Sequence, residues 1–153
     1  MKIALASDHA GYTEKERLKP VLSALGVEFD DLGTVSEESV DYPDYASNVA
    51  QQVAQGRVDQ GLLVCGSGNG MAITANKVPG VRAAVAWSEE TARLARLHND
   101  ANVLAIGART TPQAEIPKIV RAWFGTAFEG GRHAARVEKI GKVERSGQMI
   151  FDQ

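Results

Sequence analysis

The chain has 153 residues, with 17 basic and 19 acidic side chains, a formal net charge of −2, and 44% hydrophobic and 24% charged residues. This length suits one domain with a substantial core, and the charge balance excludes the basic surplus that is typical of nucleic-acid-binding proteins. No apolar run approaches the roughly 18 residues that a membrane-spanning helix needs. The N-terminal segment MKIALAS is too short before the first charges for a signal peptide, and the single cysteine cannot form an intrachain disulfide. We therefore expect one domain over residues 1–153, located in the cytoplasm.

The first third of the chain begins with a strand pattern and continues with a helical one. Residues 2–7 (KIALAS) predict a first strand. Thr13 and Glu16 have the spacing of a capping box, and the apolar stripe after them predicts a helix that Pro20 should bend or delay. Residues 27–33 (VEFDDLG) predict a second strand.

The middle of the chain repeats this alternation. A second helix with an apolar face is predicted to begin near Asp41 and Pro43. Residues 61–65 (GLLVC) are almost entirely apolar, as a central parallel strand covered on both faces should be. A further helix should open in the glycine-rich segment after this strand and reach about Lys77, followed by a strand at 82–87.

The last third of the chain completes the pattern. Ser88 is predicted to cap a helix, and residues 102–107 (NVLAIG) predict a fifth strand. Helices are then expected over about 112–124 and, after a glycine turn, over roughly 133–145. Strand and helix alternate five times, which predicts an α/β fold: a three-layer α-β-α sandwich with a Rossmann-like, doubly wound, five-stranded parallel sheet and an extra C-terminal helix. That helix could pack on its own sheet or reach a partner subunit.

The lone cysteine, Cys65, ends the third strand and is followed at once by the glycine-rich segment GSGNGM, residues 66–71. This segment lacks the third glycine of the dinucleotide-binding pattern and the Gly-Lys-Ser/Thr of the Walker pattern. Backbone amides without side-chain bulk at a helix start can instead hold an anion or a developing oxyanion. A helix N-terminus also favours a thiolate, although a free cysteine is equally often a buried structural residue, so both interpretations of Cys65 stay open.

Other polar residues follow the strands at the edge where parallel sheets bind ligands. Asp8 and His9 come after the first strand and Arg109 after the fifth, whereas His98 and Asn99 precede the fifth strand. The sequence alone therefore does not place His98 and Asn99 at the same edge as the others.

Two arginines near the C-terminus form a separate signal. Arg132 and Arg136 are spaced i, i+4 near the start of a helix, where both their mutual repulsion and the helix dipole are unfavourable. This favours a shared anion such as a phosphate, with a solvated basic face eased by neighbouring glutamates as the alternative. The three histidines, His9, His98 and His133, are far apart in the sequence and match no metal-ligand spacing, so no metal site is expected.

Five segments in order resemble the ribose-5-phosphate isomerase B family, also called the RpiB/LacA/LacB sugar-phosphate isomerases, and they span essentially the whole chain: SDHAGY (7–12), VDYPDYA (40–46), CGSGNGMAI (65–73), HNDANVLAIGAR (98–109) and EGGRHAARV (129–137). The resemblance implies a single isomerase domain that needs no cofactor and interconverts ribose 5-phosphate and ribulose 5-phosphate through a cis-enediolate. It implies Cys65 as the catalytic base, since the place where another branch of the family carries a glutamate holds Met71. His98 matches the proton donor in ring opening.

The resemblance also implies how the substrate is bound. Asp8 matches a residue that binds sugar hydroxyls, Asn99 a further substrate contact, and Tyr42 resembles a residue that lines the site. The cradle for the enediolate oxygen is Gly66, Ser67, Gly68, Asn69 and Gly70. The residues that match the family's phosphate-binding positions are His9, Arg109, Arg132 and Arg136. The family forms dimers or dimers of dimers, in which the C-terminal arginines complete the neighbour's site.

Two other interpretations remain open at this point, and a third is excluded. A sister isomerase would act on galactose 6-phosphate, allose 6-phosphate or a tetrose phosphate, because pocket length rather than these motifs decides sugar size. A non-catalytic sugar-phosphate-binding module would not need Cys65 and His98. A phosphorylated receiver domain would need an aspartate at Cys65 and a lysine at Arg109, and is excluded.

Overall fold

The computed structural model describes residues 1–151, with side chains described up to residue 147. Five parallel strands form one sheet in the order β2-β1-β3-β5-β4. The strands are β1 (Lys2–Ser7), β2 (Glu28–Asp31), β3 (Gln60–Cys65), β4 (Ala83–Val85) and β5 (Val103–Gly107). All five were predicted, and β3 is buried along its whole length, as its apolar sequence indicates.

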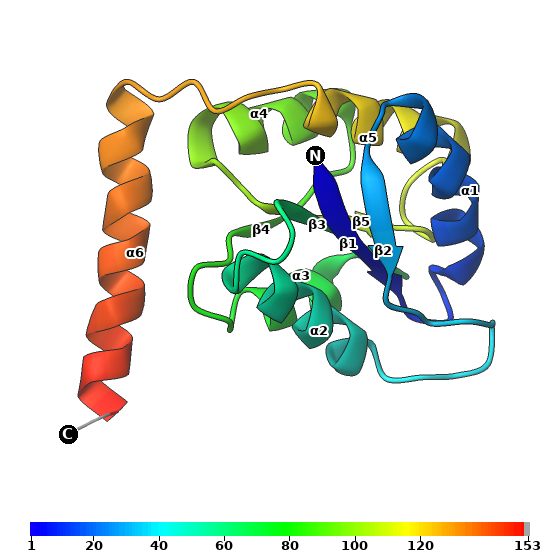
Figure 1. The fold of residues 1–153 in the computed structure, drawn as a ribbon, viewed down its shortest axis with the longest axis horizontal. Coiled ribbons are helices and arrows are strands. Elements are labelled where there is room, and N and C mark those ends of the chain that lie inside the picture. Colours follow the sequence, from blue (N-terminus) through cyan, green and yellow to red (C-terminus); the bar gives the residue numbers. More distant parts are fainter. Residues whose placement is uncertain (152–153) are drawn as a thin grey trace.

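Helices cover both faces of the sheet (Figure 1). One face carries α1 (Tyr12–Ala24), α4 (Glu89–Asn99) and α5 (Ile116–Phe124), which follows a short 3₁₀ turn at Gln113–Glu115. The other face carries α2 (Tyr42–Ala54) and α3 (Asn69–Ala75). Two separate apolar clusters fill the space between the sheet and these helices. The predicted three-layer sandwich with a doubly wound parallel sheet is confirmed.

The start of α1 differs from the prediction. The helix begins at Tyr12 after Gly11, which provides no side-chain cap, and the Thr13 hydroxyl donates instead to Glu37 Oε1 at 2.7 Å. The predicted capping box is therefore wrong, because Thr13 already lies inside the helix. Any side chain at position 11 would collide with the Val64 carbonyl, 2.2 Å from an added Cβ. Pro20 lies inside the helix without delaying its start.

The start of α4 follows the prediction closely. The Ser88 hydroxyl accepts a hydrogen bond from the Thr91 amide at 3.1 Å, and the Thr91 hydroxyl accepts one from the Ser88 amide at 3.1 Å. This reciprocal cap satisfies two amides that the helix itself cannot pair. The cap fixes where α4 begins, and the last turn of the same helix carries His98.

Two buried polar contacts stabilise the core. The indole of Trp123 is completely buried and donates to Gln60 Oε1 at 2.7 Å, which joins α5 to β3. The ammonium of Lys15 is also completely buried and donates to Asp31 Oδ1 and to the Thr34 carbonyl, both at 2.7 Å. The second contact joins α1 to the end of β2, because a buried ammonium must keep its partners.

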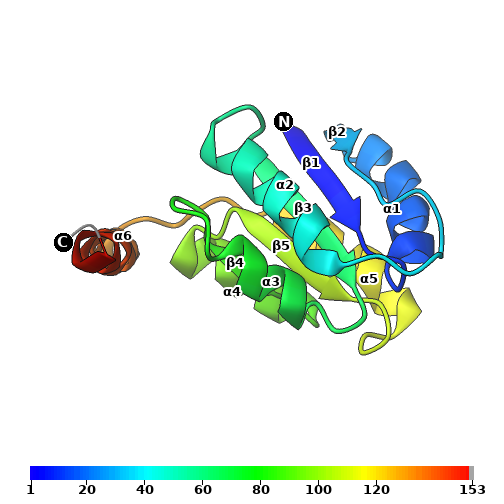
Figure 2. The ribbon, with the colours of Figure 1, turned by 90° about the horizontal axis from the view of Figure 1, so that it is seen from below.

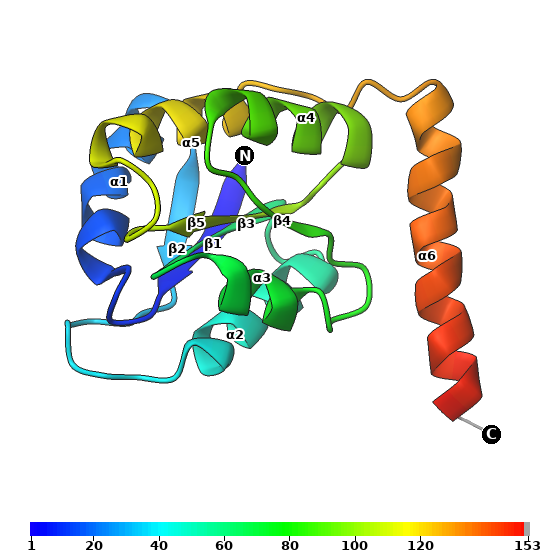
Figure 3. The ribbon, with the colours of Figure 1, turned by 180° about the vertical axis from the view of Figure 1, so that it is seen from behind.

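The last helix, α6 (Arg132–Phe151), lies apart from the sandwich at the β4 edge, after an extended connection (Figures 1 and 3). It begins one residue earlier and runs further than the predicted 133–145. Figure 2 shows it end-on beside the domain, well away from α1 and β2. Glu144 accepts a hydrogen bond from the Gly80 amide at 3.0 Å, one contact between this helix and the body of the protein. Among the described residues, none of the helices has the length and apolarity to cross a membrane.

Candidate functional site

One group of predicted site residues gathers beyond the carboxyl ends of the strands. Asp8 follows β1 and lies level with Cys65, because Ser7 of β1 pairs in register with Val64 of β3. Its amide donates to the Val64 carbonyl at 3.3 Å, and its carboxylate accepts from the Gly11 amide at 3.1 Å. Asp8 is buried, so the backbone holds its carboxylate beside the end of β3.

The glycine loop, Gly66 to Gly70, turns from the end of β3 into α3. Gly68 has φ = +81°, a left-handed conformation that favours glycine. The ring of Tyr42 packs directly on the loop, since a Cβ added to Gly70 would lie 2.6 Å from it. On the β5 side, a Cβ on Gly107 would lie 2.6 Å from the Ser67 carbonyl. The loop is thus held between α2 and the end of β5 by close backbone approaches.

Cys65 lies at the entrance to this loop and is 4% exposed. Its sulfur accepts a hydrogen bond from the Gly68 amide at 3.1 Å. Met71 is fully buried in the same apolar cluster as Cys65. At this position the chain therefore offers a thiol, and not a carboxylate, as the group that can accept a proton.

Cationic groups border the loop on its other side. The Arg109 amide donates to the Gly66 carbonyl at 2.9 Å, and the guanidinium lies 3.8 Å from where a Cβ on Gly66 would be. His9 follows Asp8, and its Nδ1 accepts from the Val40 amide at 3.2 Å. In a neutral ring, that bond leaves Nε2 as the N–H donor. The Arg109 guanidinium and the Nε2–H of His9 could hold the phosphate of a ligand whose other end lies at Cys65.

The second group of predicted residues lies elsewhere on the same chain. His98 and Asn99 end α4, which leads into the amino end of β5, while Cys65 is at the carboxyl end of the neighbouring β3. A six-residue strand separates these two edges of the sheet by about 20 Å. Within one protomer, His98 and Asn99 therefore lie far from Cys65. The sequence alone had not placed them at the edge of the sheet that carries Cys65.

Arg132 and Arg136 belong to this second group. Both occupy the first turns of α6 and are exposed, on the same helix as the buried His133 between them. The described helix start confirms that they are four residues apart on one helix, as predicted. Within the protomer they do not lie beside Arg109 at the glycine loop.

Two of the histidines, which are far apart in the sequence, meet in the structure. The imidazole rings of His98 and His133 stack with their centroids 4.2 Å apart and their planes 16° from parallel. The carboxylate of Glu129 lies 3.8 Å from Nε2 of His98 and 3.7 Å from Nε2 of His133. The sequence separates these residues because α5 and a loop lie between them, and only the packing of α6 beside α4 reveals the pair.

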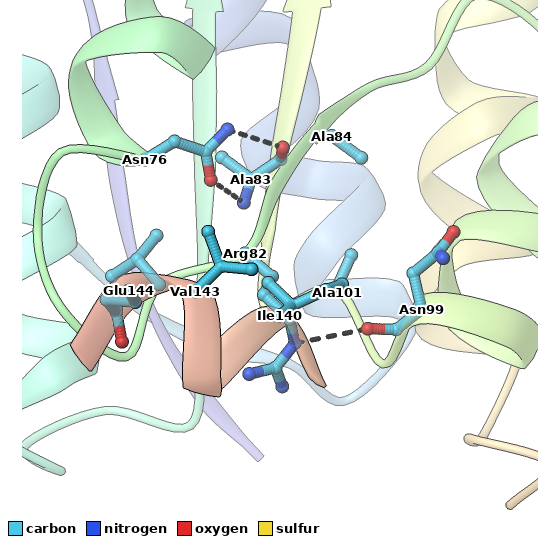
Figure 4. Close-up of a pocket in the computed structure, with 10 residues that line it drawn as sticks. Asn76, Arg82, Ala83, Ala84, Asn99, Ala101, Ile140, Val143 and Glu144 are labelled. Atoms are coloured by element: carbon cyan, nitrogen blue, oxygen red, sulfur yellow. Dashed lines mark hydrogen bonds between the residues drawn. The ribbon is translucent and has the colours of Figure 1, made fainter. Parts of the chain in front are cut away.

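A cavity of about 490 Å³ lies between α6 and the β4 edge (Figure 4). Its walls include Ile140 and Val143 of α6 and Ala83 and Ala84 of β4. Figure 4 also shows the hydrogen bond of 3.1 Å from Arg82 Nε to the Asn99 carbonyl in its lining. The cavity contains neither the thiol nor the glycine loop, so it is not the chemical site.

Open parallel α/β sheets bind ligands beyond the carboxyl ends of their strands, where this chain places its thiol and its glycine loop. The arrangement is that of an α/β enzyme for a small anionic substrate. Residues 3–140 match the Ribose/Galactose Isomerase family, and the chain belongs to that family. It is therefore an aldose–ketose isomerase.

Curated and solved relatives cover nearly the whole chain. Ribose-5-phosphate isomerase B of Escherichia coli is 49% identical over 144 residues, which is 94% of this chain and 97% of that protein. The structure of the Clostridium thermocellum ribose-5-phosphate isomerase B has a TM-score of 0.93 at 48% identity, covering 95% of this chain and 99% of the other. That of the Mycoplasma genitalium enzyme, which has ribulose 5-phosphate bound, has a TM-score of 0.90 at 42% identity, covering 94% and 96%.

Proposed function

We propose that the protein interconverts ribose 5-phosphate and ribulose 5-phosphate without a cofactor. The observation that carries this proposal is the position of Cys65 beside the glycine loop, at the ligand-binding edge of a fold that matches relatives named ribose-5-phosphate isomerase B. The bound ribulose 5-phosphate of the Mycoplasma genitalium structure supports the same substrate pair.

The isomerisation moves one proton between two neighbouring carbons. In the open-chain aldose, the Cys65 thiolate takes the proton from C2, electrons shift into a C1–C2 double bond, and the aldehyde oxygen becomes an enediolate oxygen. Amides of the glycine loop stabilise that charge as it forms, and a positioned donor of this kind commonly contributes 10²–10³ in rate. The hydroxyl proton then moves from O2 to O1, and the thiol returns its proton to C1, which gives the ketose with a C2 carbonyl and a C1 hydroxyl.

The other end of the substrate is held by charge. Arg109 and His9 border the loop and supply cationic or N–H donors for the phosphate, while Asp8 accepts from sugar hydroxyls. Binding energy from the unreactive phosphate then orients C1 and C2 against the thiol.

The site is completed by a second copy of the chain. His98, Asn99, Arg132 and Arg136 lie too far from Cys65 to contact the same five-carbon sugar within one protomer. In a symmetric homodimer, or a dimer of dimers, the partner subunit's His98 opens the sugar ring and the partner's arginines complete the phosphate site. The exposed apolar side chains Ile73, Trp87, Ile140 and Val143, and the position of α6 apart from its own sheet, support such an association.

This chemistry requires a reduced thiol. A reducing cytoplasm preserves that state, so we include a cytoplasmic location in the proposal.

The first test is turnover in the presence of a chelator. Purified protein is incubated with ribose 5-phosphate and EDTA, and ribulose 5-phosphate is followed by NMR. Formation of ribulose 5-phosphate is the expected result. Its absence, with turnover of a six- or four-carbon sugar phosphate in parallel samples, would assign the protein to a sister isomerase. Absence of turnover with every sugar would favour a binding module.

A further inference from the structure

The stacked pair of His98 and His133 joins the last turn of α4 to the first turn of α6. The amide of Glu129 donates to the Leu97 carbonyl at 3.1 Å, which fixes the connecting segment against α4. The His133 amide donates to the Gly130 carbonyl at 3.1 Å, which closes the turn that leads into α6. Backbone contacts on both sides therefore determine the position of the stack.

The two rings differ in their surroundings. His133 is buried, whereas the side chain of His98 is 39% exposed. Burial lowers the pKa of His133, the nearby His98, Arg132 and Arg136 lower it further, and only Glu129 acts in the opposite direction. The surroundings of His133 therefore favour its neutral form, and His98 is the ring of the pair that a substrate can reach.

A shared metal ion is a poor explanation for this cluster. Ligand atoms of His98, Glu129 and His133 lie within 4.8 Å of one another. An ion, however, needs the in-plane lone pairs of both imidazoles to converge on it, and stacked rings 4.2 Å apart direct them side by side. The stacked geometry instead suits one imidazole that holds the other in position.

We propose that His133 and Glu129 are positioning residues for His98, holding its imidazole in the one orientation that opens the sugar ring. The His133 face fixes the plane of the His98 ring, and the Glu129 carboxylate, 3.8 Å from Nε2, favours the ring orientation in which that nitrogen faces it. This inference rests on the proposed function, in which His98 acts on the cyclic form of the substrate. It assigns to the buried histidine a role distinct from the phosphate contacts of Arg132 and Arg136.

The test separates ring opening from proton transfer between carbons. Ribulose 5-phosphate cannot close a five-membered ring because its C5 oxygen carries the phosphate. Exchange of its C1 proton with D₂O, followed by NMR, therefore reports the Cys65 step without ring opening. Turnover of ribose 5-phosphate, which is mostly cyclic, requires both steps.

His133→Ala removes the stack and is expected to lower ribose 5-phosphate turnover by about 10- to 100-fold, since small misplacements of a reacting group cost this much. Deuterium exchange into ribulose 5-phosphate should stay within about twofold of the parent enzyme. His133→Phe keeps an aromatic face and should recover most of the lost turnover, and Glu129→Gln should show a smaller loss of the same kind. Glu138→Gln removes an exposed carboxylate on the same helix and serves as the control.

Two results would overturn the inference alone. One is full turnover of ribose 5-phosphate by His133→Ala. The other is an equal loss of turnover and exchange, which would indicate a structural role only. A parent protein that neither isomerises nor exchanges would refute the proposed function itself, and this inference with it.

Discussion

At the scale of single residues, Cys65 carries the largest expected effect. Its thiol is held by the Gly68 amide, position 71 is a methionine, and the nearby Asp8 carboxylate is already held by the Gly11 amide. Cys65→Ala should lower turnover of ribose 5-phosphate by about 10²- to 10⁴-fold, the usual contribution of a positioned base. Deuterium exchange into ribulose 5-phosphate should fall equally, in contrast to the His133 variants. Retained activity in this variant, with an unchanged circular dichroism spectrum, would exclude the thiol as base.

Gly107 is a second residue whose replacement should act through the site. A Cβ at this position would lie 2.2 Å from the Thr110 hydroxyl and 2.6 Å from the Ser67 carbonyl, so Gly107→Ala must displace the glycine loop. Gly66 is the matched control for stability, because an added Cβ there meets only ordinary contacts at 3.7 Å and beyond. Thermal unfolding of both variants should show lower stability for Gly107→Ala, and the NMR assay should show at least about tenfold lower turnover for it than for the parent. Equal stability of the two variants would contradict this reading of the loop.

At the scale of elements, the contact between α1 and β2 depends on one buried cation. Burial raises the pKa of Asp31, but hydrogen bonds from Lys15 and Lys19 outweigh it, and the net pKa is below the ordinary value of 3.8. The carboxylate therefore stabilises the fold above about pH 4, and this contribution is lost as the pH falls through the lower folded-state pKa. Asp31→Asn should cost about 2 kcal/mol at neutral pH, because Lys15 is left buried without its charged partner.

Asp30 is the control for this prediction. It lies one residue earlier on β2, and its ion pair with Lys2 at 3.3 Å is about half exposed on both sides. Asp30→Asn should change stability by less than about 1 kcal/mol. Urea unfolding of both variants and the parent, at neutral pH and near pH 3, measures the difference. If the two variants were equally stable at neutral pH, the buried contact would not stabilise the fold as argued.

The elements themselves were largely predictable, because most strands are short apolar runs, with the acidic β2 as the exception, and most helices have an apolar stripe. The N-terminus of α1 was not, because Gly11 is required by the approach of the Val64 carbonyl from β3, a contact distant in sequence. The stack of His98 on His133 and the role of Glu129 could not be predicted from the sequence for the same reason. No spacing rule connects the end of α4 with the start of α6, and only their packing does.

At the scale of the whole molecule, the division of the proposed site between two edges of the sheet predicts complementation. Cys65→Ala and His98→Ala are each expected to be nearly inactive. After unfolding and refolding together in equal amounts, half of the dimers pair one of each. In each mixed dimer, one site contains both intact residues and the other contains both replacements. The mixture should therefore recover about a quarter of the parent activity.

The control for complementation is Cys65→Ala mixed with Cys65→Ala,His98→Ala, which contains no intact site in any pairing. Analytical ultracentrifugation on the same samples measures the association state. A mixture of the two single variants that stays inactive while dimers form would place the whole site within one chain.

The fluorescence of the two tryptophans reports on two different parts of the molecule. Trp123 is completely buried with its indole nitrogen bonded to Gln60, whereas Trp87 is 63% exposed just before α4. Emission from Trp123 should shift to the red only when the core opens, while emission from Trp87 should shift to the blue when a second copy covers it. A Trp87→Phe variant isolates the first signal. Tryptophan fluorescence followed on dilution and on denaturation would then distinguish dissociation of a second copy from unfolding of the chain.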